Sequence, residues 1–426
     1  MKWLIIIVFL ENLKLYFRAE QRKNNQNKLM PMVETENHAE LKTYRELQKY
    51  LNTMPVGFPK VKSGADIRIL KRLFSPDDAK VTMYLDHKMR TVDEIWEKLD
   101  DGDKEIVKDK ASLERFLYEI AKRGGIYTIV RNGTRKFCLH PWVLGMYEIA
   151  SARSMSQENE EDMKDFLDDC SAFTGTKYGI EMLTIAKRGF RTIPIEESIT
   201  PEHKIQTYDK LVDLINTSEK FGVLKCICKL GKKIQDEPCQ VTDRLETCMA
   251  FNDYAKEYLK LGYMREVTKD EMLEIARQSE KEGLVLQPEN TKNPNFICAC
   301  CSDCCGLLHL LQSMPRPADF ASSNFHALVD SDECIGCGIC ETRCNMNAVV
   351  VNDGKATVKL ERCIGCGICV PTCKNGAIQL EENKLTIEPH EDLEEYMEHL
   401  HANKPSKFQK FWTLLKAFLR IPQNKK

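Results

Sequence analysis

A cysteine motif that occurs twice is the feature of this sequence that most constrains its fold. Residues 334–344 read C-I-G-C-G-I-C-E-T-R-C, and residues 363–373 read C-I-G-C-G-I-C-V-P-T-C. Each cysteine of the first copy recurs 29 positions later in the second. The spacing C-x2-C-x2-C-x3-C is that of a [4Fe–4S] site, so this part of the chain is predicted to fold around iron–sulfur clusters.

The fourth cysteine of each copy is predicted to serve the cluster of the other copy. Three closely spaced cysteines wrap one corner of a [4Fe–4S] cube, and so short a loop cannot also reach the fourth iron. Cluster one is therefore assigned to Cys334, Cys337, Cys340 and Cys373, and cluster two to Cys363, Cys366, Cys369 and Cys344. Glycines between these ligands let the backbone bend closely and point N–H groups at the sulfurs. They are Gly336, Gly338, Gly365 and Gly367.

This repeat resembles the bacterial-type two-cluster [4Fe–4S] ferredoxins over about 50 of the 426 residues. The resemblance implies a ferredoxin-like domain at 330–382 that binds two [4Fe–4S] clusters. The alternative is a zinc module with four thiolate ligands, which favours two separated C-x2-C pairs over overlapping triplets. The family usually has proline after the fourth cysteine, where this chain has Asn345 and Lys374. That departure puts the loop geometry and the reduction potential in doubt.

The cysteine content also restricts the compartment. The chain has 19 cysteines, and 17 of them lie between Cys226 and Cys373. A disulfide framework would suit a short secreted chain, so we expect a reducing, oxygen-poor, cytoplasmic setting. A length of 426 residues allows several domains, and a net charge of −2 gives no overall field that would select nucleic acid or membranes.

Residues 1–54 are predicted to form an N-terminal extension. Their apolar run Trp3–Leu10 is well short of the about 18 residues that a membrane span needs. It also has no clear signal-peptide cleavage site. The run could be an interfacial anchor, or precede a true start at Met30 or Met32, and a dispensable extension is the simplest interpretation.

Residues 65–145 carry the pattern of a small helical domain that ends in a hairpin. Ser75-Pro76 and the capping box Thr91–Glu94 predict two helix starts, and apolar residues at helical spacing predict a further helix over 111–123. Asn132-Gly133 then suits a type I′ turn. Helices followed by a two-stranded wing resemble the winged-helix class.

The charge of this domain bears on whether it reads DNA. The wing is locally basic, with Lys122, Arg123, Arg131, Arg135 and Lys136. However, residues 65–141 hold 16 basic and 14 acidic residues, and sequence-specific readers usually carry a stronger basic footprint. We therefore expect docking to a redox partner protein, with DNA binding as the alternative.

Between this domain and the repeat, we expect a helical linker region over 146–220 and a cysteine-rich region over 221–329. Residues 155–170 are acidic enough to form a solvated face or a linker. The pattern predicts a strand over 222–227. Helices are predicted over 199–217, 243–261 and 268–283.

Nine cysteines in this middle region are candidate metal ligands. They are Cys226, Cys228, Cys239, Cys248, Cys298, Cys300, Cys301, Cys304 and Cys305. Soft thiolates at this density suit a further [4Fe–4S] cluster or zinc, and free thiols are the remaining alternative. Spacing alone does not divide the nine into sites.

The whole arrangement, over roughly 65–382, resembles a group of winged-helix-plus-ferredoxin proteins from anaerobic microbes. This resemblance rests on the repeat together with the C-x-C and C-x-C-C-x-x-C-C motifs. It implies an α+β fold class: a winged-helix-like domain, a cysteine-rich mixed middle region and a two-cluster ferredoxin-like domain. It implies no particular reaction.

The tail, 383–426, is acidic and then basic. Residues 407–421 place aromatic and aliphatic side chains along one helical face, with lysines around the rest. Such a helix is too short to span a membrane. It suits a membrane surface or a partner's groove, and packing on its own protein is equally expected.

No nucleophile–base pair, phosphate loop or dinucleotide fingerprint stands out, so no complete catalytic site is recognised. The sequence predicts an iron–sulfur protein that relays single electrons to or from a partner redox enzyme. Two alternatives remain open at this stage. One is a redox- or oxygen-sensing DNA-binding regulator, and the other is a small-molecule reductase that works at the middle cysteines.

Overall fold

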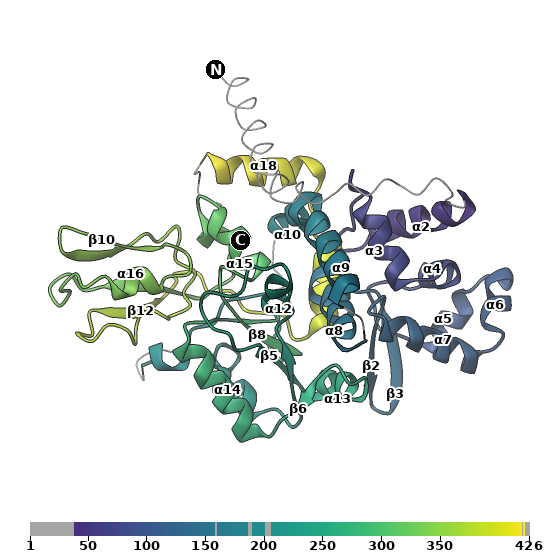
Figure 1. Cartoon of the computed structure of the whole chain (residues 1–426), viewed down its shortest axis with the longest axis horizontal. Coiled ribbons are helices and arrows are strands. Elements are labelled where there is room, and N and C mark those ends of the chain that lie inside the picture. Colours follow the sequence, from purple (N-terminus) through teal and green to yellow (C-terminus); the bar gives the residue numbers. More distant parts are fainter. Residues whose placement is uncertain (1–37, 158–159, 186–189, 201–205, 420, 422–426) are drawn as a thin grey trace, which may run out of the picture. The chain divides into compact units, whose positions relative to one another are not determined.

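The computed structural model describes residues 38–157, 160–185, 190–200, 206–419 and 421 (Figure 1). The chain divides into two compact units, Met1–Ala186 with Met397–Leu415 and Lys187–Tyr396 with Lys416–Lys426. The fold mixes helices and strands, in agreement with the predicted α+β class. The apolar run Trp3–Leu10 lies outside the described residues. Among the described helices, none is both long and apolar enough to cross a membrane.

The first unit opens with helices and a three-stranded antiparallel sheet in the order β1-β3-β2. Its elements are α2 (His38–Leu51), α3 (Ala65–Leu73), α4 (Pro76–Thr82), β1 (Arg90–Thr91), α5 (Val92–Lys98), α6 (Asp101–Val107), α7 (Lys110–Lys122), β2 (Tyr127–Arg131) and β3 (Thr134–Cys138). Leu47, Leu70 and Leu117 are among the fully buried side chains of its core.

Local sequence signals in this unit are confirmed. Ser75 and Thr91 both form complete capping boxes, with Asp78 and Glu94 respectively. Asn132 and Gly133 have φ values of 51° and 74°, as a type I′ turn between β2 and β3 requires. The assignment of this region to the winged-helix class stays a prediction.

Helix α2 belongs to this unit. Tyr44, Leu47 and Leu51 are buried. The Tyr44 hydroxyl donates to the carbonyl oxygen of Phe74 at 2.8 Å, and the side chain of Gln48 donates to the carbonyl oxygen of Phe58. Helix α2 therefore packs on this unit, and the predicted boundary near residue 54 stays a prediction.

The rest of the first unit is helical. It comprises π-helical turns at Trp142–Met146 and Thr174–Tyr178, with α8 (Tyr147–Gln157), α9 (Glu160–Phe173) and α10 (Gly179–Thr184), together with most of α17 (Leu393–Ala402) and of α18 (Lys407–Phe418), each of which crosses the unit boundary. The acidic stretch around 160–170 is a helix that buries Phe166 and Leu167. The ammonium of Lys410 on α18 pairs with the Glu181 carboxylate at 2.6 Å, so the start of this helix packs on its own protein.

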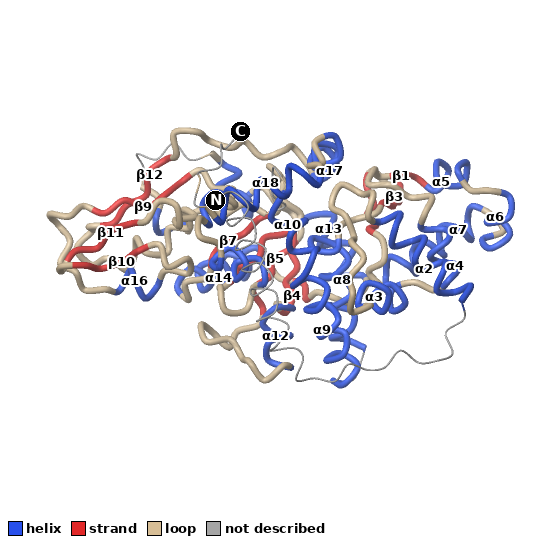
Figure 2. Tube along the Cα trace, turned by 90° about the horizontal axis from the view of Figure 1, so that it is seen from above, coloured by secondary structure: helices blue, strands red, loops and turns tan. Residues whose placement is uncertain are grey.

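A five-stranded antiparallel sheet in the order β6-β4-β5-β8-β7 forms the centre of the second unit (Figure 2). Its strands are β4 (Phe221–Lys225), β5 (Glu246–Phe251), β6 (Arg265–Glu266), β7 (Val285–Pro288) and β8 (Phe296–Cys300). The helices around it are α11 (Leu211–Asn216), α12 (Ile227–Ile234), α13 (Asn252–Lys260), α14 (Lys269–Lys281) and α15 (Gly306–Ser313).

Two of the predicted helices in this region are wrong in extent. The helix predicted over 243–261 is a strand, β5, followed by α13. Residues 246–251 read E-T-C-M-A-F and pair with strands on both sides, so inter-strand pairing prevails over local helix preference. The helix predicted over 199–217 is reduced to a short turn, Thr207–Asp209, and α11, and its residues 201–205 lie outside the described part.

The repeat folds as two antiparallel strand pairs in the same unit (Figure 1). Strand β9 (Phe325–Val329) pairs with β12 (Ile378–Glu382), and β10 (Val349–Asn352) forms a hairpin with β11 (Lys355–Val358). The short helix α16 (Ile339–Arg343) follows the first cysteine triplet.

Hydrogen bonds connect the repeat to the cysteine-rich region. The guanidinium of Arg362 donates to the carbonyl oxygens of Met346, Met314 and Gln312. Middle region and repeat thus lie in one compact unit, so their cysteines are positioned relative to each other.

Candidate metal centres

Six of the eight cysteines of the repeat share one core. Buried Cys334, Cys340 and Cys369 pack with apolar residues of β9 to β12, and Cys344, Cys363 and Cys373 pack against the same cluster. Cys337 alone among the eight is exposed. Soft thiolates gathered at a water-poor centre match the ligands that an iron–sulfur cluster requires.

Backbone N–H groups point at these sulfurs. Ala356 donates to the Sγ of Cys334 at 3.3 Å, and Ala327 donates to that of Cys363 at 3.4 Å. Ala348 donates to the Sγ of Cys344 at 3.2 Å. Such donors stabilise a thiolate that carries metal, and together with Gly336 the Ala356 N–H lowers the pKa of Cys334.

The second triplet is buried more deeply and lies close to Cys344. Burial raises the pKa of Cys366 to about 12 and raises that of Cys369 well above its ordinary value. The charge of Cys344 acts on both of these thiols, whereas the neighbours that act on Cys340 within the first triplet are Cys337 and Cys334. Cys344 thus lies near Cys366 and Cys369 of the second copy, and Cys340 of the first copy also acts on Cys369. Buried thiols of raised pKa need a bound cation to ionise.

Close backbone approach explains two of the glycines between the ligands. A Cβ atom at Gly336 would lie 2.2 Å from the carbonyl oxygen of Gly354, and one at Gly365 would lie 2.1 Å from that of Phe325. Both glycines also have positive φ. The loops therefore wrap so tightly that no side chain fits at these positions.

We expect Gly336→Ala to destabilise the first cysteine loop far more than Gly338→Ala. Both have positive φ, which costs an alanine roughly 1–2 kcal/mol. Only Gly336 meets a carbonyl, whereas a Cβ at Gly338 has no neighbour within 4 Å among the described atoms. A loss of more than about 3 kcal/mol for Gly336→Ala is the expected result in anaerobic denaturant titrations, with early release of iron. Equal losses for the two variants would contradict the tight wrapping.

Asn345, which stands where two-cluster ferredoxins usually have proline, connects the repeat to the middle region. Its side-chain oxygen accepts from the N–H of Ser302 at 3.1 Å, and its side-chain nitrogen donates to the carbonyl oxygen of Gly283. Gln312 donates to its backbone carbonyl at 2.7 Å. A proline could make neither side-chain bond. Lys374, at the other such position, is exposed to solvent.

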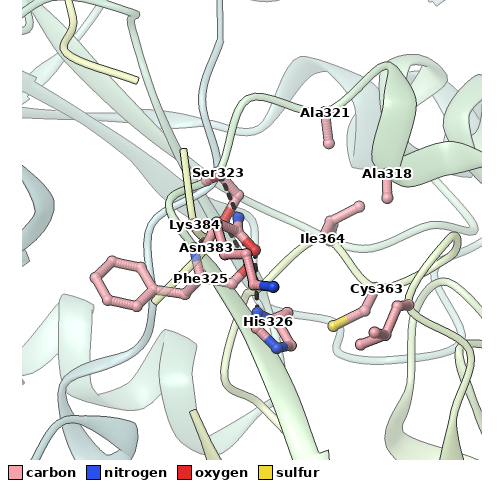
Figure 3. A pocket seen from close by; sticks show the side chains of 10 residues that line it. Ala318, Ala321, Ser323, Phe325, His326, Cys363, Ile364, Asn383 and Lys384 are labelled. Carbon is pink, nitrogen blue, oxygen red and sulfur yellow. Dashed lines mark hydrogen bonds between the residues drawn. The ribbon is translucent and has the colours of Figure 1, made fainter. Parts of the chain in front are cut away.

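A pocket of about 270 Å³ borders the second cysteine loop (Figure 3). Cys363 and His326 both line it, and Nδ1 of His326 lies 3.0 Å from the side-chain oxygen of Asn383. Lys384 lies at its rim beside Asn383 in Figure 3. Water and small solutes can thus approach Cys363 from this side.

Six of the nine middle cysteines lie near one another in a closed ring, in which each thiol acts on the pKa of its two neighbours. Going around the ring, the successive pairs are Cys226–Cys228, Cys228–Cys305, Cys305–Cys300, Cys300–Cys298, Cys298–Cys248 and Cys248–Cys226. No disulfide joins any described cysteine. We call this set the six-cysteine ring.

Strand register brings half of the ring together. Cys248 on β5 lies opposite Cys298 on β8, and Cys300 is two residues farther along the same strand. Side chains two apart on a strand, and those directly opposite on its partner, share one face of a sheet. Gln287 lies opposite Cys298 on β7, and its side-chain nitrogen is 3.8 Å from the Sγ of Cys305.

Two helix starts supply the remaining members. Cys226 is the residue before α12 and Cys305 is the residue before α15. Hydrogen bonds from Cys228 and Cys248 lower the pKa of Cys226, and the N–H of Lys229 in the first turn adds to this. Hydrogen bonds from Cys228 and Cys300 likewise lower the pKa of Cys305, with help from the N–H of Leu308. A helix N-terminus favours a thiolate.

The side chain of Lys229 supplies positive charge beside the ring. This lysine is only 1% exposed, and its ammonium donates to the carbonyl oxygen of Arg244 at 3.3 Å. Its charge acts on Cys226 and Cys248. A buried ammonium is costly unless negative charge lies nearby. Neighbouring thiols and burial hold the pKa values of Cys228, Cys248, Cys298 and Cys300 well above the ordinary value, so one lysine cannot keep all six thiols ionised without metal.

The other three middle cysteines lie together outside the ring. Cys239, Cys301 and Cys304 join Asp303, and the four ligand atoms are all within 4.8 Å of one another. The Sγ atoms of Cys239 and Cys301 are 3.5 Å apart. We call this set the Cys3Asp site. The chain has two pairs of adjacent cysteines here, and each pair is split between the two sets. Cys300 and Cys305 are in the ring, whereas Cys301 and Cys304 are in the Cys3Asp site.

Comparison with known families supports the iron–sulfur interpretation of the repeat. Residues 333–387 match the family model described as a 4Fe-4S dicluster domain. This stretch is therefore an iron–sulfur, ferredoxin-like domain that binds [4Fe–4S] cofactor. No curated protein and no solved structure matches the chain significantly.

Proposed function

We propose that this protein transfers single electrons through two [4Fe–4S] clusters in its ferredoxin-like domain and a further metal cluster at the six-cysteine ring. The observation that carries the proposal is the core shared by six of the eight repeat cysteines, with backbone N–H groups aimed at Cys334, Cys344 and Cys363, in a segment that matches an iron–sulfur family. A bound [4Fe–4S] cluster supplies one-electron oxidation and reduction.

Cys334, Cys337, Cys340 and Cys373 would hold one cluster, and Cys363, Cys366, Cys369 and Cys344 the other. The proximity of Cys344 to Cys366 and Cys369 supports this crossed assignment. The chain's own part in the chemistry is to exclude water and to fix the thiolates in place. Its backbone N–H groups also offset their negative charge, which favours the reduced state.

Electron exchange with a partner is proposed at the edge around Cys337. This cysteine is exposed, and the neighbouring Ile335 and Ile339 are 67% and 42% exposed. Apolar side chains beside a redox ligand allow a transient protein contact that brings two centres close without a strong charge requirement. The partner is proposed to be a redox enzyme or carrier protein.

For the six-cysteine ring we propose iron–sulfur chemistry rather than free thiols. Three of these thiols, Cys226, Cys300 and Cys305, are buried beside the other three, so a polynuclear cation is the natural counter-charge for their ionised forms. The ring is close to the ferredoxin-like domain, since the Cys298–Cys305 segment contacts Asn345 through Ser302. This contact supports electron exchange between the two regions.

Reversible reduction tests the electron-transfer proposal. Protein purified without oxygen should be brown, bleach on reduction and recover its absorbance on reoxidation with no loss of iron. A colourless protein with no iron would contradict the proposal.

The helical domain at 65–145 is proposed to dock to protein rather than to read DNA. Several of its cations are engaged internally. The guanidinium of Arg123 pairs with Asp78 at 2.6 Å, and that of Arg135 lies 4.4 Å from the centre of the Tyr118 ring. The Lys122 ammonium pairs with Glu119 at 2.7 Å. Cations satisfied by the protein's own groups add little to phosphate binding.

We therefore expect binding to duplex DNA to be weak and equal for specific and random sequences. Electrophoretic shifts at physiological salt, with promoter and random duplexes and with oxidised and reduced protein, measure this. Low-salt binding with a steep salt dependence would be nonspecific counterion release. A preference for promoter over random duplex above roughly a thousandfold, changing with redox state, would show that the protein is a DNA-binding regulator and not an electron carrier.

Contact of residues 407–421 with a membrane surface, in a cytoplasmic setting, is proposed as a secondary role of the tail. Phe408 and Trp412 are 69% and 44% exposed on α18. Lys410 is meanwhile held by Glu181, which favours packing on the protein for the rest of the helix.

A further inference from the structure

We propose that Cys239, Cys301, Asp303 and Cys304 bind one zinc ion at a site separate from the six-cysteine ring, and that this ion holds the loop between α12 and β5 in place. The proposal concerns a structural metal rather than an electron carrier, so it goes beyond the proposed function.

The spacing of the donor atoms fits a single ion. With Zn–S bonds of about 2.3 Å, two thiolates on one tetrahedral ion lie about 3.8 Å apart. The 3.5 Å separation of the Cys239 and Cys301 sulfurs, and the 4.8 Å limit for the whole set, agree with that geometry.

The donor chemistry selects the class of metal. Three thiolates exclude the hard cations Ca2+ and Mg2+, which take oxygen ligands. Three sulfurs and one carboxylate oxygen make four tetrahedral ligands, the set that a closed structural zinc site uses.

Asp303 is oriented for ligation. The backbone N–H of Gln240 donates to its Oδ2 at 2.7 Å. Its Oδ1 is shielded from solvent and accepts from no N–H or O–H group of the described chain. A carboxylate oxygen without a donor of its own, beside three thiols, is a ready metal ligand.

The loop has little else to fix its position. Residues 236–243 are all exposed or half-exposed, so they bury no apolar core of their own. Among the described contacts, its middle is attached by the Gln240–Asp303 bond and the Cys239–Cys301 contact. Loops that cannot bury apolar surface are commonly held by a metal or a disulfide.

The loop between α12 and β5 is connected to the six-cysteine ring by hydrogen bonds. Just after the Cys3Asp site, the carbonyl of Arg244 accepts from buried Lys229, and that of Leu245 accepts from the N–H of Cys226 at 2.6 Å. A zinc ion at Cys239 would therefore stabilise the segment that covers the ring at Cys226 and Lys229.

Metal analysis of the full chain, purified anaerobically, tests the proposal. We expect about one zinc per chain beside the iron. Cys239→Ser and Asp303→Asn should each lower zinc toward none and leave iron unchanged. Gln240→Ala is the matched control, because the side chain of Gln240 contacts only the Pro238 carbonyl among described groups and its backbone bond to Asp303 is kept. It should retain zinc.

Limited proteolysis supplies a second readout. Loss of zinc should expose residues 236–243 to cleavage in both ligand variants but not in Gln240→Ala, and Co2+ added in place of zinc should give the visible bands of a tetrahedral thiolate site. If Cys239→Ser fails to fold, Asp303→Asn and Co2+ substitution of the unaltered chain still decide the matter. Absence of zinc and of the Co2+ bands overturns the proposal. So does a loss of iron, rather than zinc, in the ligand variants.

Discussion

Serine in place of Cys344 should remove the cluster of the second cysteine copy and leave that of the first. The charge of Cys344 acts on Cys366 and Cys369, and the Ala348 N–H donates to its sulfur, so we propose it as the fourth ligand of the cluster held by Cys363, Cys366 and Cys369. A hydroxyl is a poor ligand for cluster iron. Iron in the ferredoxin-like domain should fall from about eight to about four per chain.

Paired substitutions identify which cluster is lost. Cys344→Ser combined with Cys363→Ser should lose no more iron than either alone, because both ligate one cluster. Cys344→Ser combined with Cys334→Ser should lose about twice as much. The reverse pattern would place Cys344 with Cys334 and refute the crossed assignment. Cys373→Ser should behave reciprocally, pairing with Cys334→Ser.

The second large effect is expected at Cys300 in the middle region and not at the adjacent Cys301. Cys300→Ser should abolish the iron held beyond the about eight of two cubes, because Cys300 lies near Cys298 and Cys305 within the six-cysteine ring. Cys301→Ser, the next residue, should leave iron unchanged, because its sulfur lies with Cys239 instead. Iron and sulfide analysis of the two variants, with visible spectra, measures the difference.

Cys305→Ser and Cys304→Ser repeat this test at the second adjacent pair. Cys305 is in the ring and Cys304 is in the Cys3Asp site. Equal iron loss for both members of a pair would mean that all nine cysteines serve one centre. Iron that stays near about eight in the unaltered protein would mean that the ring does not bind an iron–sulfur cluster.

Short-range signals were sufficient to predict part of this fold. The capping boxes at Ser75 and Thr91 and the turn at Asn132-Gly133 depend on residues a few positions apart, and all three are present. The repeated motif likewise predicted the iron–sulfur domain that the family match supports at 333–387. Residues 243–261 were predicted as one helix because β5 depends on pairing with distant strands, which the local pattern does not contain.

The division of the nine middle cysteines depends on tertiary structure. Cys248 and Cys298 are 50 positions apart and meet only through sheet register. The direction of successive side chains then separates Cys300 from Cys301. Because side chains alternate between the two faces of a strand, the sequence could have predicted that Cys300 and Cys301 point in different directions. That prediction required residues 296–300 to be recognised as a strand.

Three further residues were missed as contributors to the sites. Lys229 lies three positions after Cys226, yet its burial beside the ring became evident only from α12. Asp303 stands between Cys301 and Cys304, and that position among thiols was a readable signal of a ligand. Asn345 was noticed as a departure from proline, but its contacts with Ser302 and Gly283 require the folded middle region.

The central claim is that this chain carries electrons on two [4Fe–4S] clusters in its ferredoxin-like domain. The most direct test is electron paramagnetic resonance of anaerobic protein during a reductive titration, with spins counted against iron in the Cys300→Ser variant, which isolates the repeat. The account predicts about eight irons and two one-electron centres that couple magnetically when both are reduced. A single centre, or zinc in place of iron at the repeat, would contradict it.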